Sequence, residues 1–170
     1  MNETNGPIKI LGIDPGYAIV GFGLIEKDGS KLRPLDYGAI ETPAKMSTAE
    51  RLIMIERKMV ELLSEYAPDE IAVEELFFNT NITTGIKVAQ ARGVVLLSCA
   101  KMCDKLFEYT PLQIKSTVTG NGTANKTQIQ YMVRSILRLK ETPKPDDAAD
   151  ALAAAICHAY TVQGVKRGLK

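Results

Sequence analysis

The chain is poor in histidine and cysteine. His158 is the only histidine in 170 residues, which excludes active sites built from several imidazoles. The three cysteines are Cys99, Cys103 and Cys157, an odd number with no CxxC pair. Neither a disulfide framework nor a zinc site is therefore expected. We expect these cysteines to be small buried hydrophobic side chains in a reducing compartment.

Long apolar runs and an excess of one charge are also missing. No stretch approaches the roughly 20 apolar residues that cross a bilayer, although 45% of the residues are hydrophobic. Residues 1–5 are polar and lack the basic and then apolar order of a signal peptide. We therefore expect a cytoplasmic protein with no membrane partner. The formal net charge of +1 does not by itself indicate a nucleic-acid partner.

Positive charge is nevertheless concentrated in one region. Between residues 101 and 140, Asp104 and Glu108 are the only acids. The basic residues of the same region are Lys101, Lys105, Lys115, Lys126, Arg134, Arg138 and Lys140. Both a surface that faces phosphates and an ordinary solvated face fit this asymmetry.

The first forty residues predict three consecutive strands. Residues 8–13 are a short apolar run, typical of a buried strand, and an Asp-Pro-Gly turn follows. Residues 20–24 alternate in character, with Gly21 and Gly23 on one face and larger apolar side chains on the other. A third strand is expected at residues 35–40. The short turns between them predict an antiparallel meander.

From residue 47 onward, helical and strand patterns alternate. We expect further strands at residues 71–73 and 106–109 and helices at residues 48–67, 82–102, just after 111, 125–139 and 145–162. This order predicts an α/β fold, a mixed five-stranded sheet flanked by helices, in one domain over residues 1–170. Residues 1–7 and 163–170 are expected to be flexible tails.

Four acidic residues fall at the ends of these elements. Asp14 follows the first strand and Glu74 ends the fourth. Asp147 and Asp150 are three residues apart in the first turns of the last helix, so they share one helix face. The ends of strands are where α/β sheets place ligands. Several carboxylates without histidine or thiol suit a hard cation such as Mg²⁺ or Mn²⁺.

Each acid also has a purely structural interpretation. The role of Asp14 could simply be to form a turn with the following Pro-Gly, and Asp147 could complement the helix dipole. Glu74, beside Glu75, could be a solvated strand end. Element spacing alone therefore predicts metal-dependent phosphoryl chemistry and nothing more specific.

Short motifs narrow this choice. They are Ile-Leu-Gly-Ile-Asp-Pro-Gly (10–16), Gly-Phe-Gly (21–23), Glu-Glu-Leu-Phe (74–77), Ala-Gln-Ala-Arg-Gly (89–93), Tyr-Thr-Pro (109–111), Gln-Ile-Lys (113–115), Gly-Asn-Gly (120–122) and Asp-Ala-Ala-Asp-Ala-Leu-Ala (147–153). Their order and spacing over residues 8–160 resemble those of the RuvC family of Holliday junction resolvases. The resemblance implies an RNase H-like fold and a crossover junction endodeoxyribonuclease active in homologous recombination and DNA repair. It also implies paired symmetric nicks that leave 5′-phosphate and 3′-hydroxyl ends.

The resemblance also implies roles for particular residues. Asp14, Glu74, Asp147 and Asp150 match the catalytic carboxylates, which would bind two Mg²⁺ ions per active site, with Mn²⁺ as a substitute. The Asp-Ala-Ala-Asp motif begins at Asp147, so Asp146 is an additional neighbouring acid and not one of the matched carboxylates.

The DNA contacts implied by the resemblance are Phe77, Lys115 and Lys126. Phe77 or its neighbour Phe78 would stack on an unpaired base, and the lysines would contact phosphates. A buried phenylalanine and ordinary surface lysines are the alternatives. The chain departs from the family at Ala18, where relatives often carry an arginine.

A four-way junction has two-fold symmetry, which a homodimer matches. Gly85, Ala89 and Gly93 recur every four residues, continued by Leu97. This ridge of small residues fits either a second protomer or the chain's own sheet. The branch-migration proteins RuvA and RuvB are further partners implied by the resemblance.

Three other functions compete with this prediction. An Asp-x-Gly turn after a strand also opens sugar kinases and actin-like ATP-binding domains. An RNase H-like nuclease could act on another branched or hybrid nucleic acid. A protein that binds DNA structures without cleaving them is the third alternative.

Overall fold

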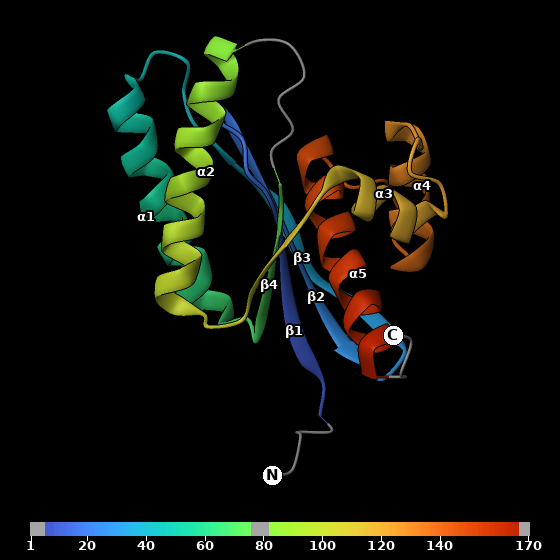
Figure 1. Ribbon diagram of the computed structural model, residues 1–170. Helices are drawn as coiled ribbons and strands as arrows, with labels where there is room; N and C mark the ends of the chain where they lie inside the picture. The colour runs from blue at the N-terminus through green and yellow to red at the C-terminus, as the bar shows by residue number, and fades with distance from the viewer. Residues whose placement is uncertain (1–5, 76–81, 167–170) are drawn as a thin grey trace.

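A mixed β-sheet lies between two layers of helices (Figure 1). The computed structural model describes residues 6–75 and 82–166. The elements are β1 (Ile8–Asp14), β2 (Ile19–Asp28), β3 (Lys31–Glu41), α1 (Thr48–Tyr66), β4 (Glu70–Glu74), α2 (Ile82–Met102), β5 (Leu106–Tyr109), α3 (Pro111–Thr119), α4 (Lys126–Ile136) and α5 (Asp146–Lys166). The five strands have the order β3-β2-β1-β4-β5. β1–β2 and β2–β3 are antiparallel, whereas β1–β4 and β4–β5 are parallel. The predicted mixed five-stranded sheet is confirmed.

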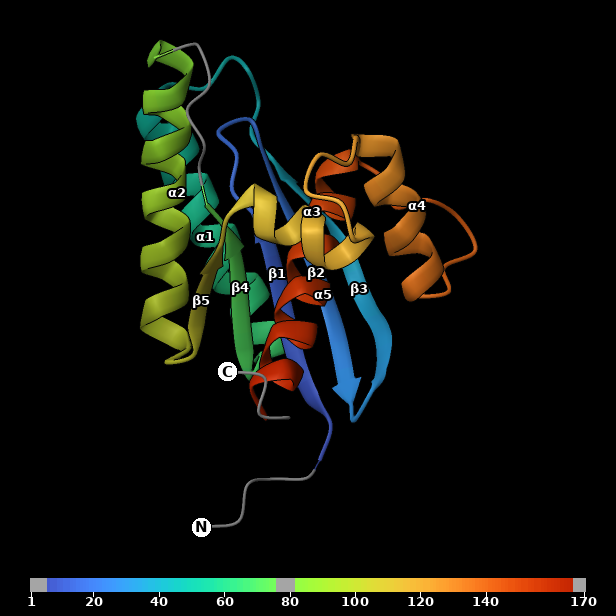
Figure 2. The same ribbon diagram turned by 45° about the vertical axis from the view of Figure 1, so that its right-hand side comes forward.

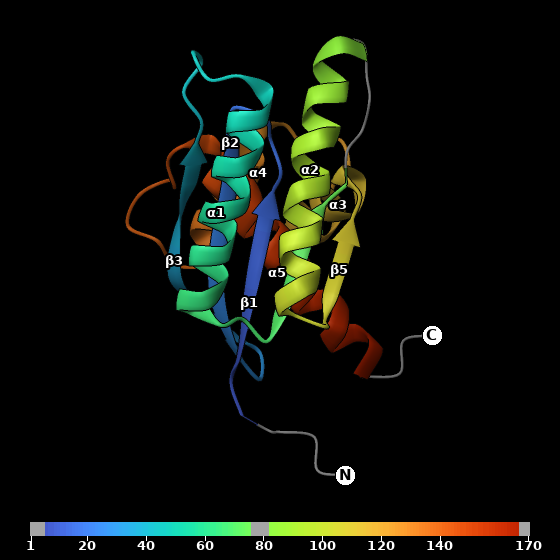
Figure 3. The same cartoon turned by 90° about the vertical axis from the view of Figure 1, so that its left-hand side faces the viewer.

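The two faces of the sheet carry separate apolar cores. α1 and α2 cover one face (Figure 3), where Ile55 and Met59 of α1 pack with Leu11 and Ile13 of β1. α5 covers the other face, with α3 and α4 outside it (Figure 2). Cys99 and Cys157 are buried in these cores as free thiols, as predicted, whereas Cys103 is only partly buried. None of the described helices is long and apolar enough to span a membrane.

α5 lies directly on the backbone of β1 and β2. Its contact surface on the sheet is Gly12, Gly21 and Gly23, here named the glycine seam. A Cβ atom at Gly12 would lie 2.0 Å from the carbonyl oxygen of Ala151, and one at Gly21 would lie 2.1 Å from that of Asp147. Only glycine permits so close an approach. The seam therefore fixes how near the start of α5 sits to the end of β1.

Several boundaries differ from the predicted ones, and one correction concerns the expected C-terminal tail, because α5 continues to Lys166 and so includes residues 163–166. β3 begins at Lys31 because it pairs with β2 along its whole length, and single-sequence alternation does not reveal such pairing. α4 ends at Ile136, before the predicted residue 139, since Arg138 adopts a φ of 53°. α5 begins at Asp146, so Pro145 precedes the helix instead of occupying its first turn.

A buried hydrogen-bond network ties α5 to the parallel edge of the sheet. His158 of α5 is fully buried. Its Nδ1 lies 2.7 Å from the hydroxyl of Tyr109, and its Nε2 lies 2.8 Å from Oε2 of Glu70. A neutral imidazole protonated on Nε2 satisfies both partners, by donating to Glu70 and accepting from Tyr109. Burial lowers the pKa of His158 despite the opposing effect of Glu70, which favours that neutral form.

Tyr109→Phe should lower the free energy of unfolding by about 1–3 kcal/mol, because Nδ1 of the buried His158 ring then has no donor. Urea denaturation at pH 7 measures the change. Tyr131→Phe is the matched control, since Tyr131 is 67% exposed. Equal losses in the two variants would show that the network adds nothing to stability.

Candidate active site

The end of β1 and the end of β4 carry the first two acids. These strands are parallel neighbours, with Ile13 opposite Val73. The next residues, Asp14 and Glu74, are the last of their strands and therefore lie side by side at this end of the sheet. Arg92 of α2 holds the second of these strand ends, since its Nε donates to the carbonyl oxygen of Glu74 at 3.3 Å.

The first turns of α5 bring the other two acids to the same end of the sheet. Gly21 is opposite Asp14 in the β1–β2 register and lies directly beneath the backbone of Asp147. Asp150 follows one helical turn later. The glycine seam thus places Asp147 and Asp150 over the end of β1.

The burial and nearness of these acids change their ionisation. The pKa of Asp14 is raised to about 8, first by burial and then by its negatively charged neighbours Glu74, Asp150 and Asp147. The pKa of Glu74 is raised to about 7, again first by burial and then by Asp150. Burial raises the pKa of Asp150 as well. Such an accumulation of desolvated negative charge is costly without cations nearby.

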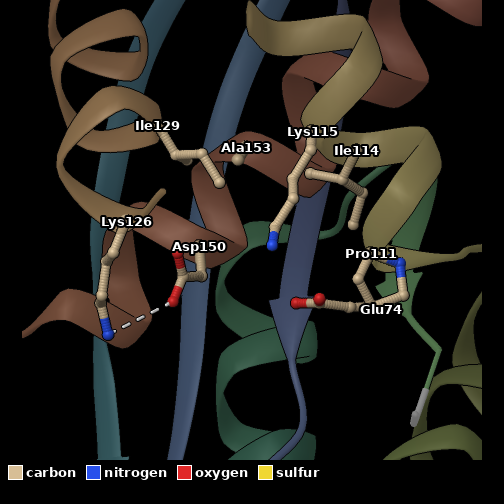
Figure 4. A pocket seen from close by; sticks show the side chains of 8 residues that line it. All are labelled: Glu74, Pro111, Ile114, Lys115, Lys126, Ile129, Asp150 and Ala153. Carbon is tan, nitrogen blue, oxygen red and sulfur yellow. Dashed lines mark ion pairs between the residues drawn. The ribbon is translucent and has the colours of Figure 1, made fainter. Parts of the chain in front are cut away.

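A pocket of about 250 Å³ opens between two of the acids (Figure 4). Glu74 lies near Lys115 of α3 on one side, and Asp150 lies near Lys126 of α4 on the other. The remaining lining residues are Pro111, Ile114, Ile129 and Ala153. Both predicted lysines thus lie beside the acids, each facing a different carboxylate.

Lys126 is tied to the start of α5. Its Nζ lies 3.2 Å from Oδ2 of Asp146 and 3.7 Å from Oδ2 of Asp150. Gln130 donates to the other oxygen of Asp146 at 2.9 Å. The carboxylate of Asp146 is therefore engaged by α4, while that of Asp147 acts on Asp14.

The donor set fits a hard divalent cation. All four side chains offer carboxylate oxygens, and the pKa values of Glu74 and Asp14 are raised to about 7 and 8, first by burial and then by neighbouring carboxylates. Within residues 6–75 and 82–166, no three histidine, cysteine, aspartate or glutamate side chains form a preformed cluster of metal ligands.

Comparison with known proteins decides the family. The family described as Crossover junction endodeoxyribonuclease RuvC matches residues 10–158. The chain belongs to the RuvC family. RuvC of Alkaliphilus oremlandii is 57% identical over 152 residues, 89% of this chain and 93% of that protein. RuvC of Halothermothrix orenii is 56% identical over 149 residues, 88% and 90% of the two chains.

Solved structures of the family have the same fold. RuvC of T. thermophilus, in complex with a Holliday junction substrate, superposes with a TM-score of 0.85 at 35% identity. The match covers 92% of this chain and 95% of that one. The yeast mitochondrial Holliday junction resolvase Ydc2 has a TM-score of 0.67 at 14% identity, which shows a shared fold only. The predicted RNase H-like fold is confirmed.

Two features predicted from the sequence have different outcomes. Phe77 and Phe78 lie outside the described residues. On α2, the side that packs in the core contains Ala91 and Val95, whereas Leu97 is 55% exposed and a Cβ at Gly93 would meet nothing within 4 Å. The ridge at Gly93 and Leu97 therefore faces away from the sheet.

The apolar walls of the pocket and the contact of Arg92 were not predicted from the sequence. Ile114 and Ile129 come from α3 and α4, which no sequence pattern placed beside Asp150. Arg92 was visible only as part of the Ala-Gln-Ala-Arg-Gly motif. Its hydrogen bond to a backbone carbonyl leaves no signature in one sequence.

Metal-free protein should lose stability as the pH rises from 6.5 to 8. The pKa of Asp14 is higher in the folded chain, at about 8, than its ordinary value of 3.8. The folded state therefore holds the proton more tightly, and its advantage disappears as the pH rises towards 8. We expect a loss on the order of 1–2 kcal/mol, measured by urea denaturation in EDTA. Asp14→Asn should flatten this dependence, and an equally steep one would contradict the assignment.

Proposed function

We propose that the chain is a metal-dependent endonuclease that resolves Holliday junctions in homologous recombination and DNA repair. The observation that carries the proposal is the placement of Asp14, Glu74, Asp147 and Asp150 at one end of the sheet of a RuvC chain. The T. thermophilus relative in complex with a Holliday junction substrate supports the choice of substrate. The same family match favours this activity over a sugar kinase or actin-like domain.

In this proposal the carboxylates hold two Mg²⁺ ions, with Mn²⁺ as a substitute. Asp14 would serve both ions, because it lies on the central strand between Glu74 and the start of α5. Glu74 would serve one ion, and Asp147 and Asp150 the other. Bound ions of this kind activate the attacking water and stabilise the leaving 3′ oxygen. The expected products are nicks with 5′-phosphate and 3′-hydroxyl ends.

The remaining residues would position the DNA. Lys115 and Lys126 lie on opposite sides of the pocket and would contact phosphates near the scissile bond. In this role Lys126 would exchange its carboxylate partners for a phosphate when ions bind Asp150. Phe77 would stack on a base at the opened crossover.

The dimer of the proposal would form through the outer face of α2. Ile86 and Leu97 are 54% and 55% exposed, and Gly93 between them leaves space for a close approach. Leu97→Glu should shift the protein from dimer to monomer in sedimentation at micromolar concentration. Ile53→Glu on α1, where the side chain is 68% exposed, is the control and should remain dimeric. A monomeric wild type would refute the dimer.

RuvA and RuvB are proposed as further partners.

A mobile, end-labelled four-way junction tests the activity. With Mg²⁺ we expect symmetric nicks near the crossover, mapped on both strands of like polarity, and no nicks in EDTA. Linear duplex and RNA–DNA hybrid should compete poorly. Preferred cleavage of the hybrid would mean that the protein is a nuclease for hybrid nucleic acid and not for Holliday junctions. Binding without cleavage would favour a non-catalytic role.

A further inference from the structure

Arg51 of α1 is a buried cation without a counter-ion. The residue is 7% exposed, and its Nε has no hydrogen-bond partner. Its Nη1 donates to the hydroxyl of Thr42 at 3.3 Å, and its guanidinium carbon lies 4.7 Å from the centre of the Tyr17 ring. No carboxylate forms an ion pair with it in the described part of the chain. Buried arginines are rarely left without one.

A second cation reaches the same ring. Nζ of Lys87, on α2, lies 5.6 Å from the centre of Tyr17. The side chain is exposed, and among residues 6–75 and 82–166 it too has no carboxylate partner. Cation–π contact compensates only part of the repulsion between two like charges that converge on one aromatic ring. An anion from outside the chain would relieve the rest.

Tyr17 connects this pair of cations to the candidate active site. It lies three residues after Asp14, in the loop between β1 and β2. Its hydroxyl is 2.9 Å from that of Thr48, and its carbonyl oxygen accepts from the hydroxyl of Thr42 at 2.9 Å. The loop is thus fixed to the start of α1, and the position of Tyr17 relative to Asp14 is defined.

The cations lie on the side of the sheet opposite to the pocket lysines. Arg51 and Lys87 belong to the layer of α1 and α2, whereas Lys115 and Lys126 belong to α3 and α4 (Figure 1). Both pairs stand at the end of the sheet where β1 and β4 finish. A strand of nucleic acid that crosses the carboxylates would therefore meet positive charge on each side.

We propose that Lys87, Tyr17 and Arg51 form a second phosphate-binding site, which holds a backbone phosphate of the nucleic acid on the α1–α2 side of the carboxylates. Lys87 makes the direct contact. Arg51, held by Tyr17 and Thr42, contributes an unneutralised charge from below, where the protein screens it less than water would. The proposal rests on the proposed function, since a nucleic-acid substrate supplies the phosphate.

Lys87→Gln tests the site, because an exposed lysine can be replaced without affecting folding. Affinity for a four-way junction is measured in EDTA over a range of NaCl concentrations. The loss of one phosphate contact should reduce the slope of log K against log salt by about 1 and weaken binding roughly tenfold at moderate salt. Lys101→Gln, on the last turn of the same helix, is the matched control and should bind as wild type.

Arg51→Lys distinguishes charge from shape. It keeps the cation, so it should bind the junction within about threefold of wild type, whereas Arg51→Gln should weaken binding. Thermal unfolding of both variants is recorded to show that they fold. An unchanged salt slope in Lys87→Gln, with normal cleavage by the wild type, overturns this inference alone. A wild type that neither binds nor cuts junctions overturns the proposed function instead.

Discussion

Asp14→Asn should abolish cleavage of a four-way junction, with a rate loss on the order of 10³-fold or more. Asp14 ends the central strand and is the acid whose pKa responds to all three of the others. Asparagine keeps its shape but removes the charge that would hold cations. Single-turnover cleavage with saturating Mg²⁺ measures the effect.

Binding of the junction should survive in the same variant. The proposed phosphate contacts come from Lys115, Lys126 and Lys87, and removal of a negative charge beside them does not weaken their attraction for DNA. Asp146→Asn is the control, since that carboxylate is engaged by Lys126 and Gln130, and its rate should stay within a few-fold of wild type. Near-normal cleavage by Asp14→Asn would refute the assignment of the site.

Gly21→Ala should impair both folding and cleavage. The added Cβ would lie 2.1 Å from the carbonyl oxygen of Asp147, and a backbone atom cannot turn aside as a side chain can. We expect a loss of about 1–3 kcal/mol in the free energy of unfolding. Displacement of Asp147 and Asp150 by even 1 Å should also slow cleavage by about 10²-fold in the folded fraction.

Two further variants separate these effects. Gly12→Ala meets Ala151 and Ala155, farther along α5 than Asp147, and should destabilise the fold with a smaller effect on the rate per folded molecule. Gly6→Ala meets nothing within 4 Å and should be neutral. Wild-type stability in Gly21→Ala, measured by urea denaturation, would mean that α5 does not rest on the seam.

Much of the fold was predictable because its signals are local. The apolar run at residues 8–13 and the alternation at 20–24 each identify a strand, and the placement of Asp14 at the end of the first strand follows from position alone. Which element packs against a given face of the sheet is not a local property of the sequence. The face formed by Gly21 and Gly23 was evident in the sequence, but nothing there showed that α5 would cover it.

The site was predictable in part for the same reason. Asp14 and Glu74 meet because β1 and β4 are parallel neighbours, which the sequence order of elements suggests. The contact of Arg51 and Lys87 with Tyr17 joins three segments that are far apart in the chain, and no motif connects them. Lys126 was expected near phosphate, whereas its ion pair with Asp150 depends on how α4 packs against α5.

The division of the core into two layers has a practical consequence for protein engineering. The separation of α5 from the sheet is set by main-chain contact at Gly12 and Gly21, independently of side chains such as Ile55 and Met59 on the far side. Substitutions that improve heat resistance can thus be sought among those far-side residues, and they should leave the positions of the acids on α5 unchanged.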